Sequence, residues 1–512
     1  MYDYLKDQFR NFAGKTFRTH QEDAIQFAIE SDKPIVVIKA PTGSGKSLIG
    51  SCIAATTQKS TYLVHSKQLQ TQLNIDFPEF ELMQGRNNFK CLQNGFPADK
   101  CIHSINGFKC SHKAAAFGRN ELQPCPYEKR KIEVAAAPWQ LLNYPYFLFE
   151  ANYVGKFSDR ELIICDEGDL VEGLLLDFVQ LQIPFGILKK LKIGLPKYKT
   201  TKAENGIESW KQWAEWSLGP ISRALNSAED LSEKRRYQSL MTRMTILKDN
   251  VDHTWIMQED DNRVTFKPIW MSKQLSQEFF FKHAPKFVFM SATFPPAEIM
   301  GQLLGRDPGD FDYFEVPSNF PVSHRQVMVR SEVQLNKESM ETDLARNKVC
   351  EQVVDILADH VDEKGIIHTH SYQIAGWIMD LGLDRLITHD SSDREEVLEH
   401  FKKSEDRLVL VSPSMERGVD LPYDDCRFAI IVKCPFPYLG DKFISSRAYS
   451  GSIGNLWYKS ITAQDIVQAC GRGVRHADDW CATYCLDGKI QRLIIDNRRL
   501  FPEYFLEAVE IV

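Results

Sequence analysis

Short runs of apolar, often β-branched residues recur along the 512-residue chain, and each run is bounded by turn residues. Most of them precede a stretch with helical spacing, which is typical of parallel strands buried between layers of helices. The runs form two sets of four, divided by a loop-like segment at 305–320. We therefore predict an α/β protein with two parallel-sheet domains. The eight predicted strands are 34–38, 61–64, 161–165, 286–290, 365–367, 407–411, 428–432 and 481–486.

Two long insertions interrupt the first set of strands. The first insertion, residues 85–135, is rich in Gly, Asn, Lys and Pro and contains four cysteines. The second insertion, residues 172–282, has mostly helical spacing and no strand-like alternation, so we expect it to be mainly helical.

Aromatic and basic residues stand out in the second insertion. Trp210, Trp213 and Trp216 recur at a spacing of three, which predicts a helix whose aromatic stripe packs into a core, with base stacking as the alternative. The lysines between 189 and 202 surround Tyr198, and both a solvated loop and a surface that contacts nucleic acid fit this pattern.

Composition excludes some classes of protein. The apolar content of 43% is ordinary for a globular protein, and no segment approaches the roughly 18 uninterrupted apolar residues that a membrane span needs. The start of the sequence lacks the pattern of a secretory signal, so we expect an intracellular, cytoplasmic protein, associated with the nucleoid in a prokaryotic or viral setting. The net charge of −7 means that nucleic-acid binding would need a local basic groove.

A phosphate-binding loop follows the first predicted strand. The loop contains small residues that let backbone N–H groups face phosphate oxygens, and a helix begins at its end. Lys46 is suited to the β- and γ-phosphates, and Ser47 to Mg²⁺. We predict an ATP site made by Thr42, Gly43, Ser44, Gly45, Lys46 and Ser47.

The third predicted strand ends in two carboxylates. Asp166 is suited to holding Mg²⁺, and Glu167 to orienting or deprotonating the attacking water. In the second domain Gln468, Arg472 and Arg475 would share one face of a helix, and the two arginines would stabilise charge on the γ-phosphate.

These motifs, in this order, resemble those of superfamily 2 helicases. The segment 17–21 resembles the adenine-reading Q motif, which implies that Gln21 contacts ATP. Residues 166–169 resemble the DEAH box and 291–293 motif III. Residues 411–420 resemble motif V, which includes Asp420, and 468–475 resemble motif VI.

Further segments narrow the resemblance to the XPD/DinG family of iron–sulfur helicases. These segments are 85–91, 125–127, 143–144, 364–372 and 434–437. From spacing alone, Cys91, Cys101, Cys110 and Cys125 suit either zinc or an iron–sulfur cluster. The resemblance implies that they hold a [4Fe–4S] cluster and that the second insertion is the Arch domain.

The resemblance also gives domain boundaries. The first RecA-like domain would comprise 1–84, 136–171 and 283–308, with the cluster domain at 85–135 and the Arch domain at 172–282. The second RecA-like domain would be 309–512.

The function implied is ATP-dependent 5′→3′ translocation on single-stranded DNA with unwinding of duplex junctions or RNA–DNA hybrids, by a monomer without a membrane partner. Asp169 stands where the family has histidine, and Arg417 where many members have glutamate. These departures, and the short chain, leave a second interpretation open. In it, the protein is a strand-stimulated ATPase that remodels complexes, or serves as an effector subunit, without separating strands.

Overall fold

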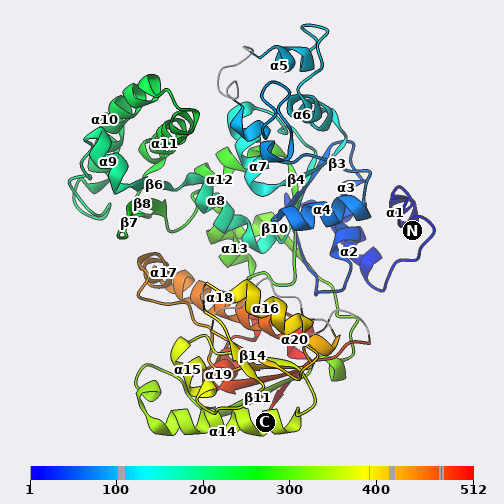
Figure 1. The fold of residues 1–512 in the computed structure, drawn as a ribbon. Coiled ribbons are helices and arrows are strands. Elements are labelled where there is room, and N and C mark those ends of the chain that lie inside the picture. Colours follow the sequence, from blue (N-terminus) through cyan, green and yellow to red (C-terminus); the bar gives the residue numbers. More distant parts are fainter. Residues whose placement is uncertain are drawn as a thin grey trace.

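The computed structural model describes residues 2–101, 110–390, 392–413, 421, 423–471, 474 and 478–512. Two parallel sheets lie one above the other in Figure 1, and both insertions extend from the upper one. The predicted fold class, with two RecA-like α/β domains, is confirmed. None of the helices in the described ranges combines the length and apolar character needed to cross a bilayer.

The first sheet has seven parallel strands in the order β10-β1-β9-β5-β2-β4-β3. Successive side chains of β1 enter two different cores, with Ile35 and Val37 on one face and Val36 and Ile38 on the other, as expected for a strand buried on both sides. The strands of this sheet are β1 (Ile35–Lys39), β2 (Ser60–Val64), β3 (Glu81–Leu82), β4 (Trp139–Asn143), β5 (Leu162–Asp166), β9 (Lys286–Ser291) and β10 (Phe311–Glu315). The accompanying α-helices are α1 (Asp3–Lys6), α2 (Gln21–Glu30), α3 (Lys46–Ala54), α4 (Lys67–Asp76), α7 (Tyr144–Phe149) and α13 (Ala297–Leu304).

The second sheet also has seven parallel strands, in the order β13-β14-β12-β15-β16-β11-β17. Its strands are β11 (Val327–Val333), β12 (Gly365–His368), β13 (Leu386–Thr388), β14 (Val409–Ser412), β15 (Phe428–Ile431), β16 (Ala482–Asp487) and β17 (Val509–Ile511). Its α-helices are α14 (Asp343–Asp359), α15 (Tyr372–Met379), α16 (Arg394–Lys403), α17 (Lys442–Ala448), α18 (Ser452–Cys470), α19 (Gly488–Asp496) and α20 (Glu503–Leu506). All eight strands predicted from the sequence are present in the two sheets.

The predicted domain boundary at 308/309 is wrong by several residues. β10 lies beyond it but pairs with β1 along its whole length, so the first sheet continues to Glu315. The segment around 305–310 is the turn that brings the chain back to the edge of this sheet, because α13 ends at Gly305 in a left-handed conformation.

The first insertion contains the short helices α5 (Ser111–Ala116) and α6 (Pro126–Ala136). The second insertion is mainly helical, with α8 (Val171–Val179), α9 (Phe185–Leu191), α10 (Gly206–Ser227), α11 (Leu231–Asn250) and α12 (Lys273–Phe279). The expectation that it has no strands is wrong. Three antiparallel strands form a small sheet in the order β6-β8-β7, namely β6 (Leu181–Pro184), β7 (Trp255–Glu259) and β8 (Arg263–Pro268). β7 and β8 form a local antiparallel pair, whereas β6 lies on the other side of the long helical hairpin in sequence and pairs with β8.

The aromatic stripe of α10 is divided between core and surface. Trp210 and Trp213 are buried and pack on Phe266 of β8, with ring centroids 5.0 and 4.9 Å away. Trp216 is 78% exposed. The predicted core packing therefore holds for two of the three indoles.

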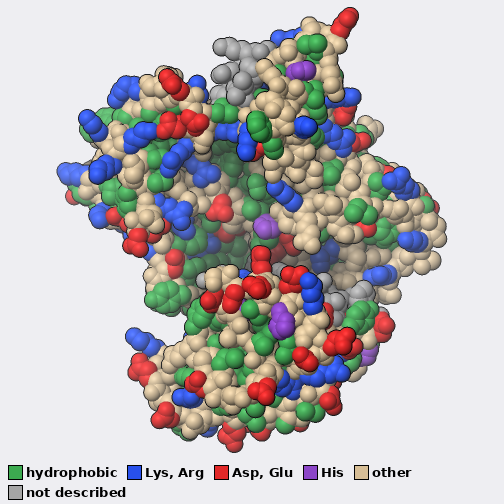
Figure 2. Space-filling model, in the orientation of Figure 1, with side chains coloured by type: hydrophobic (Ala, Val, Ile, Leu, Met, Phe, Trp, Pro, Cys, Tyr) green, Lys and Arg blue, Asp and Glu red, His purple; other side chains and the backbone are tan. Residues whose placement is uncertain are grey.

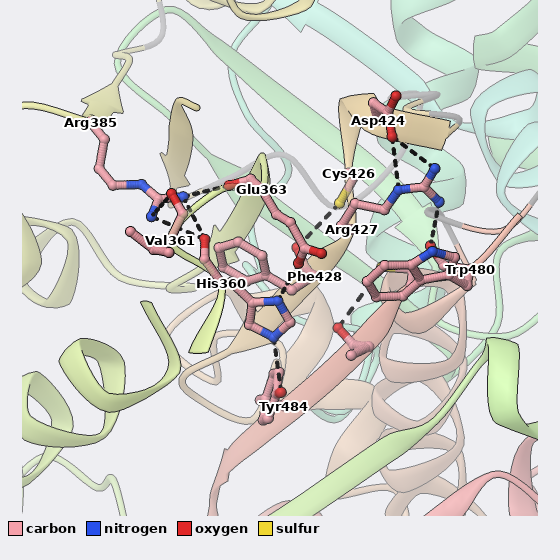
Figure 3. Close-up of polar contacts among 12 residues, drawn as sticks. His360, Val361, Glu363, Arg385, Asp424, Cys426, Arg427, Phe428, Trp480 and Tyr484 are labelled. Atoms are coloured by element: carbon pink, nitrogen blue, oxygen red, sulfur yellow. Dashed lines mark hydrogen bonds and ion pairs between the residues drawn. The ribbon is translucent and has the colours of Figure 1, made fainter. Parts of the chain in front are cut away.

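Polar side chains connect the loop before β12 to neighbouring strands of the second sheet (Figure 3). His360 stacks on Phe428, the first residue of β15, and its ring nitrogens contact Glu363 Oε2 at 2.5 Å and the Tyr484 hydroxyl at 2.9 Å. The Arg385 guanidinium donates to the carbonyl oxygens of residues 360, 361 and 363. The loop between α14 and β12 is thus tied to β15, β16 and the start of β13.

Removing the Tyr484 hydroxyl should destabilise the second domain. In Tyr484→Phe the buried His360 Nε2 loses its partner, so we expect the free energy of unfolding to fall by about 1–3 kcal/mol. Chemical denaturation followed by tyrosine and tryptophan fluorescence measures the change. Tyr449→Phe is the matched control, since Tyr449 is 74% exposed. Equal stability of the two variants would contradict this role for the His360–Tyr484 contact.

Candidate active site

The phosphate-binding loop joins β1 to α3. Gly43 and Gly45 have φ angles of 80° and 82°, which only glycine adopts without strain, and α3 begins at Lys46. Lys46 Nζ donates to the carbonyl oxygens of Ala40, at 3.0 Å, and of Pro41. The ammonium therefore lies over the loop itself, where phosphates would bind. Thr42 is half-buried within the loop, and Ser47 lies in the first turn of α3.

Two side chains from the segment before β1 hold this loop. The buried Gln21 accepts from the Arg18 N–H and donates through Nε2 to the Ser44 carbonyl at 2.9 Å. Arg18 Nη1 donates to the Gly43 carbonyl at 2.7 Å. A Cβ on Gly45 would lie 2.2 Å from Gln21 Nε2, so a side chain at this position would displace the amide. Arg18 is a loop-positioning residue that reasoning from the sequence missed.

Asp166 ends β5 and is only 4% exposed. Tyr62 on β2 donates to its Oδ2 at 3.3 Å, and Tyr144 donates to its carbonyl at 2.8 Å. Burial raises the pKa of the Asp166 carboxyl above its ordinary value, whereas the nearby Lys46 ammonium favours the charged form. The Tyr62 hydroxyl also contacts Ser47, so one phenol hydroxyl meets both residues predicted to hold Mg²⁺.

Glu167 adopts a left-handed conformation, with φ of 49°. The side chain is about half exposed, and its Oε2 lies 4.0 Å from Nδ1 of His65 at the end of β2. The following Gly168 packs against Phe289 so closely that a Cβ would lie 2.8 Å from that ring. The carboxylate predicted to orient water is therefore held at the open side of the site.

A side chain from the second domain reaches this site. Gln468 Nε2, on α18, lies 3.4 Å from Asp169 Oδ2 and 3.4 Å from Thr293 Oγ1. These contacts connect the segments that resemble motifs VI, II and III. An aspartate at position 169 can therefore accept a hydrogen bond from the second domain although histidine is absent.

The common helix face predicted for Gln468, Arg472 and Arg475 stays a prediction. α18 ends at Cys470, with Gly471 as its C-cap, so Gln468 lies in the last turn of this helix. Arg472, Arg475 and Asp420 lie outside the described residues, as does Arg417.

The four cysteines of the first insertion line one small cavity, together with Arg86, His112 and Glu128. Cys91 and Cys110 are buried, and Cys101 and Cys125 are half-buried. Cys125 is the N-cap of α6, where backbone N–H groups face its sulfur, although burial raises the pKa of its thiol. Within the described ranges, no three His, Cys, Asp or Glu side chains are close enough to hold a single metal ion.

A larger cavity of about 1030 Å³, here called the central cavity, lies where the two insertions meet the first domain. Figure 2 shows a hollow between the second insertion and the rest of the upper half of the molecule. The basic residues that line the central cavity are Arg86, Lys113, Lys131, Lys156, Arg235 and Arg243; the aromatic ones are Phe117, Phe149, Tyr153 and Phe178; the acidic ones are Glu128, Glu150 and Asp177. The lining is therefore basic and aromatic on balance.

Comparison with known proteins agrees with this geometry. Residues 347–505 match the helicase C-terminal domain family. Over nearly the whole chain the fold matches that of a solved XPD helicase, with a TM-score of 0.63 and 17% identity, covering 97% of this chain and 100% of the other. A structure titled as apo XPD gives a TM-score of 0.60 at 16% identity, with the same coverage. The chain is therefore similar to XPD helicases in fold, and residues 347–505 are similar to a helicase C-terminal domain.

Curated relatives match over shorter segments. A probable ATP-dependent helicase of Methanocaldococcus jannaschii is 23% identical over 229 residues, which cover 38% of this chain and 35% of that protein. The ATP-dependent DNA helicase CHL1 of Saccharomyces cerevisiae is 23% identical over 240 residues, covering 39% of this chain and 27% of that protein. The matches thus span about a third or less of the length of these relatives.

Arg447 links the second domain to the segment that follows the Asp166 site. It lies on α17, is only 2% exposed, and its guanidinium lies over the rings of Trp270, Phe443 and Trp457. Nη2 donates to Glu172 of α8 at 2.5 Å, and Nε donates to the Ile269 carbonyl at 2.7 Å. A single side chain therefore joins the second domain, α8 and the end of β8. Sequence reasoning missed it, because nothing local distinguishes this arginine from exposed ones.

Replacing Arg447 by alanine should strongly weaken the packing between these parts. The carboxylate of Glu172 would lose its partner in a mostly buried position, so we expect a loss of about 3–5 kcal/mol in stability. Arg447→Lys should restore only part of it, since an ammonium cannot make both hydrogen bonds and stack on the aromatic rings. Thermal unfolding measures both effects.

The matched control for this prediction is Arg499→Ala. Arg499 also connects the two domains, through Glu298 at 2.8 Å, but the pair is exposed, and we expect a cost below about 1 kcal/mol. Similar unfolding midpoints for Arg447→Ala and Arg499→Ala would contradict the importance assigned to burial.

Proposed function

We propose that the chain is an ATP-dependent DNA helicase that moves 5′→3′ along a single strand and unwinds duplexes, forks or RNA–DNA hybrids. The observation that carries the proposal is the contact of Gln468 with Asp169 and Thr293. This contact crosses from one sheet domain to the other. A movement of Asp169 or Thr293 in the first domain would therefore displace Gln468 in the second.

The proposed chemistry uses the groups at the carboxyl ends of β1 and β5. Lys46 and the loop N–H groups bind the phosphates, and Ser47 with Asp166 would hold the Mg²⁺ that ATP brings. Glu167 orients the attacking water from the open side of the site. Gln21 and Asp420 would add contacts to ATP, and Arg472 and Arg475 would approach the γ-phosphate as the domains close.

The central cavity supports strand binding. Six basic side chains against three acidic ones favour a polyanion, and the aromatic rings offer faces on which bases can stack. The cavity is bordered by both insertions, so a strand within it would contact each of them. The 5′→3′ polarity rests on the family resemblance.

The first insertion fits a [4Fe–4S] cluster by the chemistry of its donors. Cys91, Cys101, Cys110 and Cys125 provide four thiols around one cavity, as such a cluster requires. When bound, the cluster would tie these distant segments together. Glu128 lines both the cysteine cavity and the central cavity, so the position of α6 affects the strand path as well as the thiols.

Strand displacement on duplexes with either a 5′ or a 3′ single-stranded tail tests the motor. Anaerobically purified protein with ATP and Mg²⁺ should unwind from the 5′ tail only. Lys46→Ala should lower ATP turnover about 10²–10³-fold, because a positioned positive charge at the phosphates is lost, while strand binding persists. Strand-stimulated ATPase without displacement from either tail would instead favour a translocase or effector subunit that remodels complexes.

Replacing Cys110 by serine tests the cluster. We expect loss of the brown colour and of bound iron, and strand displacement about 10- to 100-fold lower, with a smaller effect on ATP turnover. Cys350→Ser is the control, since Cys350 lies on α14 in the second domain and should leave iron content unchanged. Equal iron content in wild type and Cys110→Ser would refute the proposed ligand.

A further inference from the structure

A groove of about 690 Å³ lies on the second insertion, between the segment that follows α9 and the first half of α10. Its lining includes Lys197, Tyr198, Gln212, Trp213 and Trp216. Trp216 is 78% exposed, whereas its neighbour Trp213 is buried. A large indole left in water beside a groove is unusual enough to need an explanation, because its burial would be favourable.

The groove is built from anchored parts. Trp213 Nε1 donates to the Gly194 carbonyl at 2.6 Å, and Trp210 Nε1 donates to the Tyr198 carbonyl at 2.7 Å. Both indoles are fixed in turn by Phe266 of the small sheet. The backbone of the 194–198 segment is therefore held in place, and the groove exists before any ligand binds.

The lining of the groove includes one basic and one acidic side chain, Lys197 and Glu208, and the basic residues that would attract a polyanion lie beside it. The segment 189–202 contains six lysines and no acidic residue. All six are exposed; Lys190 pairs with Glu233 and Lys199 with Glu259. Lys197 lies over the Tyr198 ring at 5.2 Å, next to the groove. In Figure 2, many Lys and Arg side chains lie on the part of the molecule that Figure 1 labels α9 to α11, with acidic ones among them.

The groove is separate from the central cavity. α10 packs along α11, and Arg235 and Arg243 of α11 line the central cavity. The groove lies on α10 and the segment before it, and the two sets of lining residues have no member in common.

We propose that this groove binds a second single strand of nucleic acid, with a base stacked on Trp216 and phosphates near the lysines of 189–202. Proteins bind single strands without sequence preference by stacking bases on aromatic rings and by placing basic residues near the phosphates. The inference rests on the proposed helicase function, in which the strand excluded from the central cavity is produced at the junction. We assign the groove to this excluded strand.

The test compares two labelled substrates by fluorescence anisotropy, using the full-length protein. One is a duplex with a single 5′ tail, and the other is a fork with the same 5′ tail and a second, 3′ oligo(dT) arm. Trp216→Ala should weaken binding of the fork by about fivefold to a hundredfold, the range expected for loss of one stacked base, and leave binding of the one-tailed duplex unchanged. Because Trp216 is exposed, the variant should fold normally.

Two further substrates separate stacking from charge. A fork whose second arm is abasic keeps the phosphates but offers no base. Wild type should bind this abasic fork as weakly as Trp216→Ala binds the fork with the oligo(dT) arm. Trp216→Ala should bind both forks with equal affinity. Tyr438→Ala, at an 81% exposed aromatic residue of the second domain, is the matched control and should bind both original substrates like wild type.

Three outcomes overturn the inference. The first is fork binding that Trp216→Ala leaves unchanged, and the second is equal weakening of both substrates. The third is competition by polyglutamate at the groove that depends on Trp216, with no such competition by the second arm. The last result would assign the groove to an acidic protein segment. Binding of the one-tailed duplex, and the stimulation of ATP turnover by that duplex, test the proposed helicase function without involving the groove. A wrong helicase proposal can therefore be distinguished from a wrong assignment of the groove.

Discussion

A buried carboxylate at the end of β5 is the constraint around which the first domain is arranged. Asp166 is nearly inaccessible to water, and a charge in that position must be compensated. Tyr62 contacts the carboxylate, Tyr144 holds the adjacent carbonyl, and Lys46 provides an opposite charge nearby. The aromatic hydroxyls in β2 and at the start of α7 thus serve the site as well as the core.

The parallel sheet explains why these groups meet. β9 lies between β1 and β5, so the carboxyl ends of three adjacent strands carry the phosphate loop, the Thr293 segment and Asp166. Segments more than a hundred residues apart in sequence therefore converge at one sheet edge. Both long insertions leave the sheet without disturbing this edge, because they occur between strands.

Communication between the domains runs through adjacent helices. Gln468 of α18 contacts Asp169, and Arg447 of α17 pairs with Glu172, three residues further along the chain. Arg447 also donates to the backbone just after β8. A displacement of α17 and α18 would consequently act on the Asp166 site and on the second insertion together.

The sequence by itself determined the two parallel-sheet domains, the phosphate loop and the carboxylates at the end of β5. These features depend on local pattern: apolar runs between turn residues, glycines where φ is positive, and charges at strand ends.

Tertiary structure alone decided the rest. β6 is short and pairs with β8 across the helical hairpin, and β10 looks like part of a linker until it pairs with β1. Arg18, Tyr62 and Arg447 acquire their roles only from neighbours distant in sequence, and Trp216 differs from Trp213 only by which side of α10 meets β8. Burial and pairing over long sequence separations are properties of the folded chain, and no local pattern encodes them.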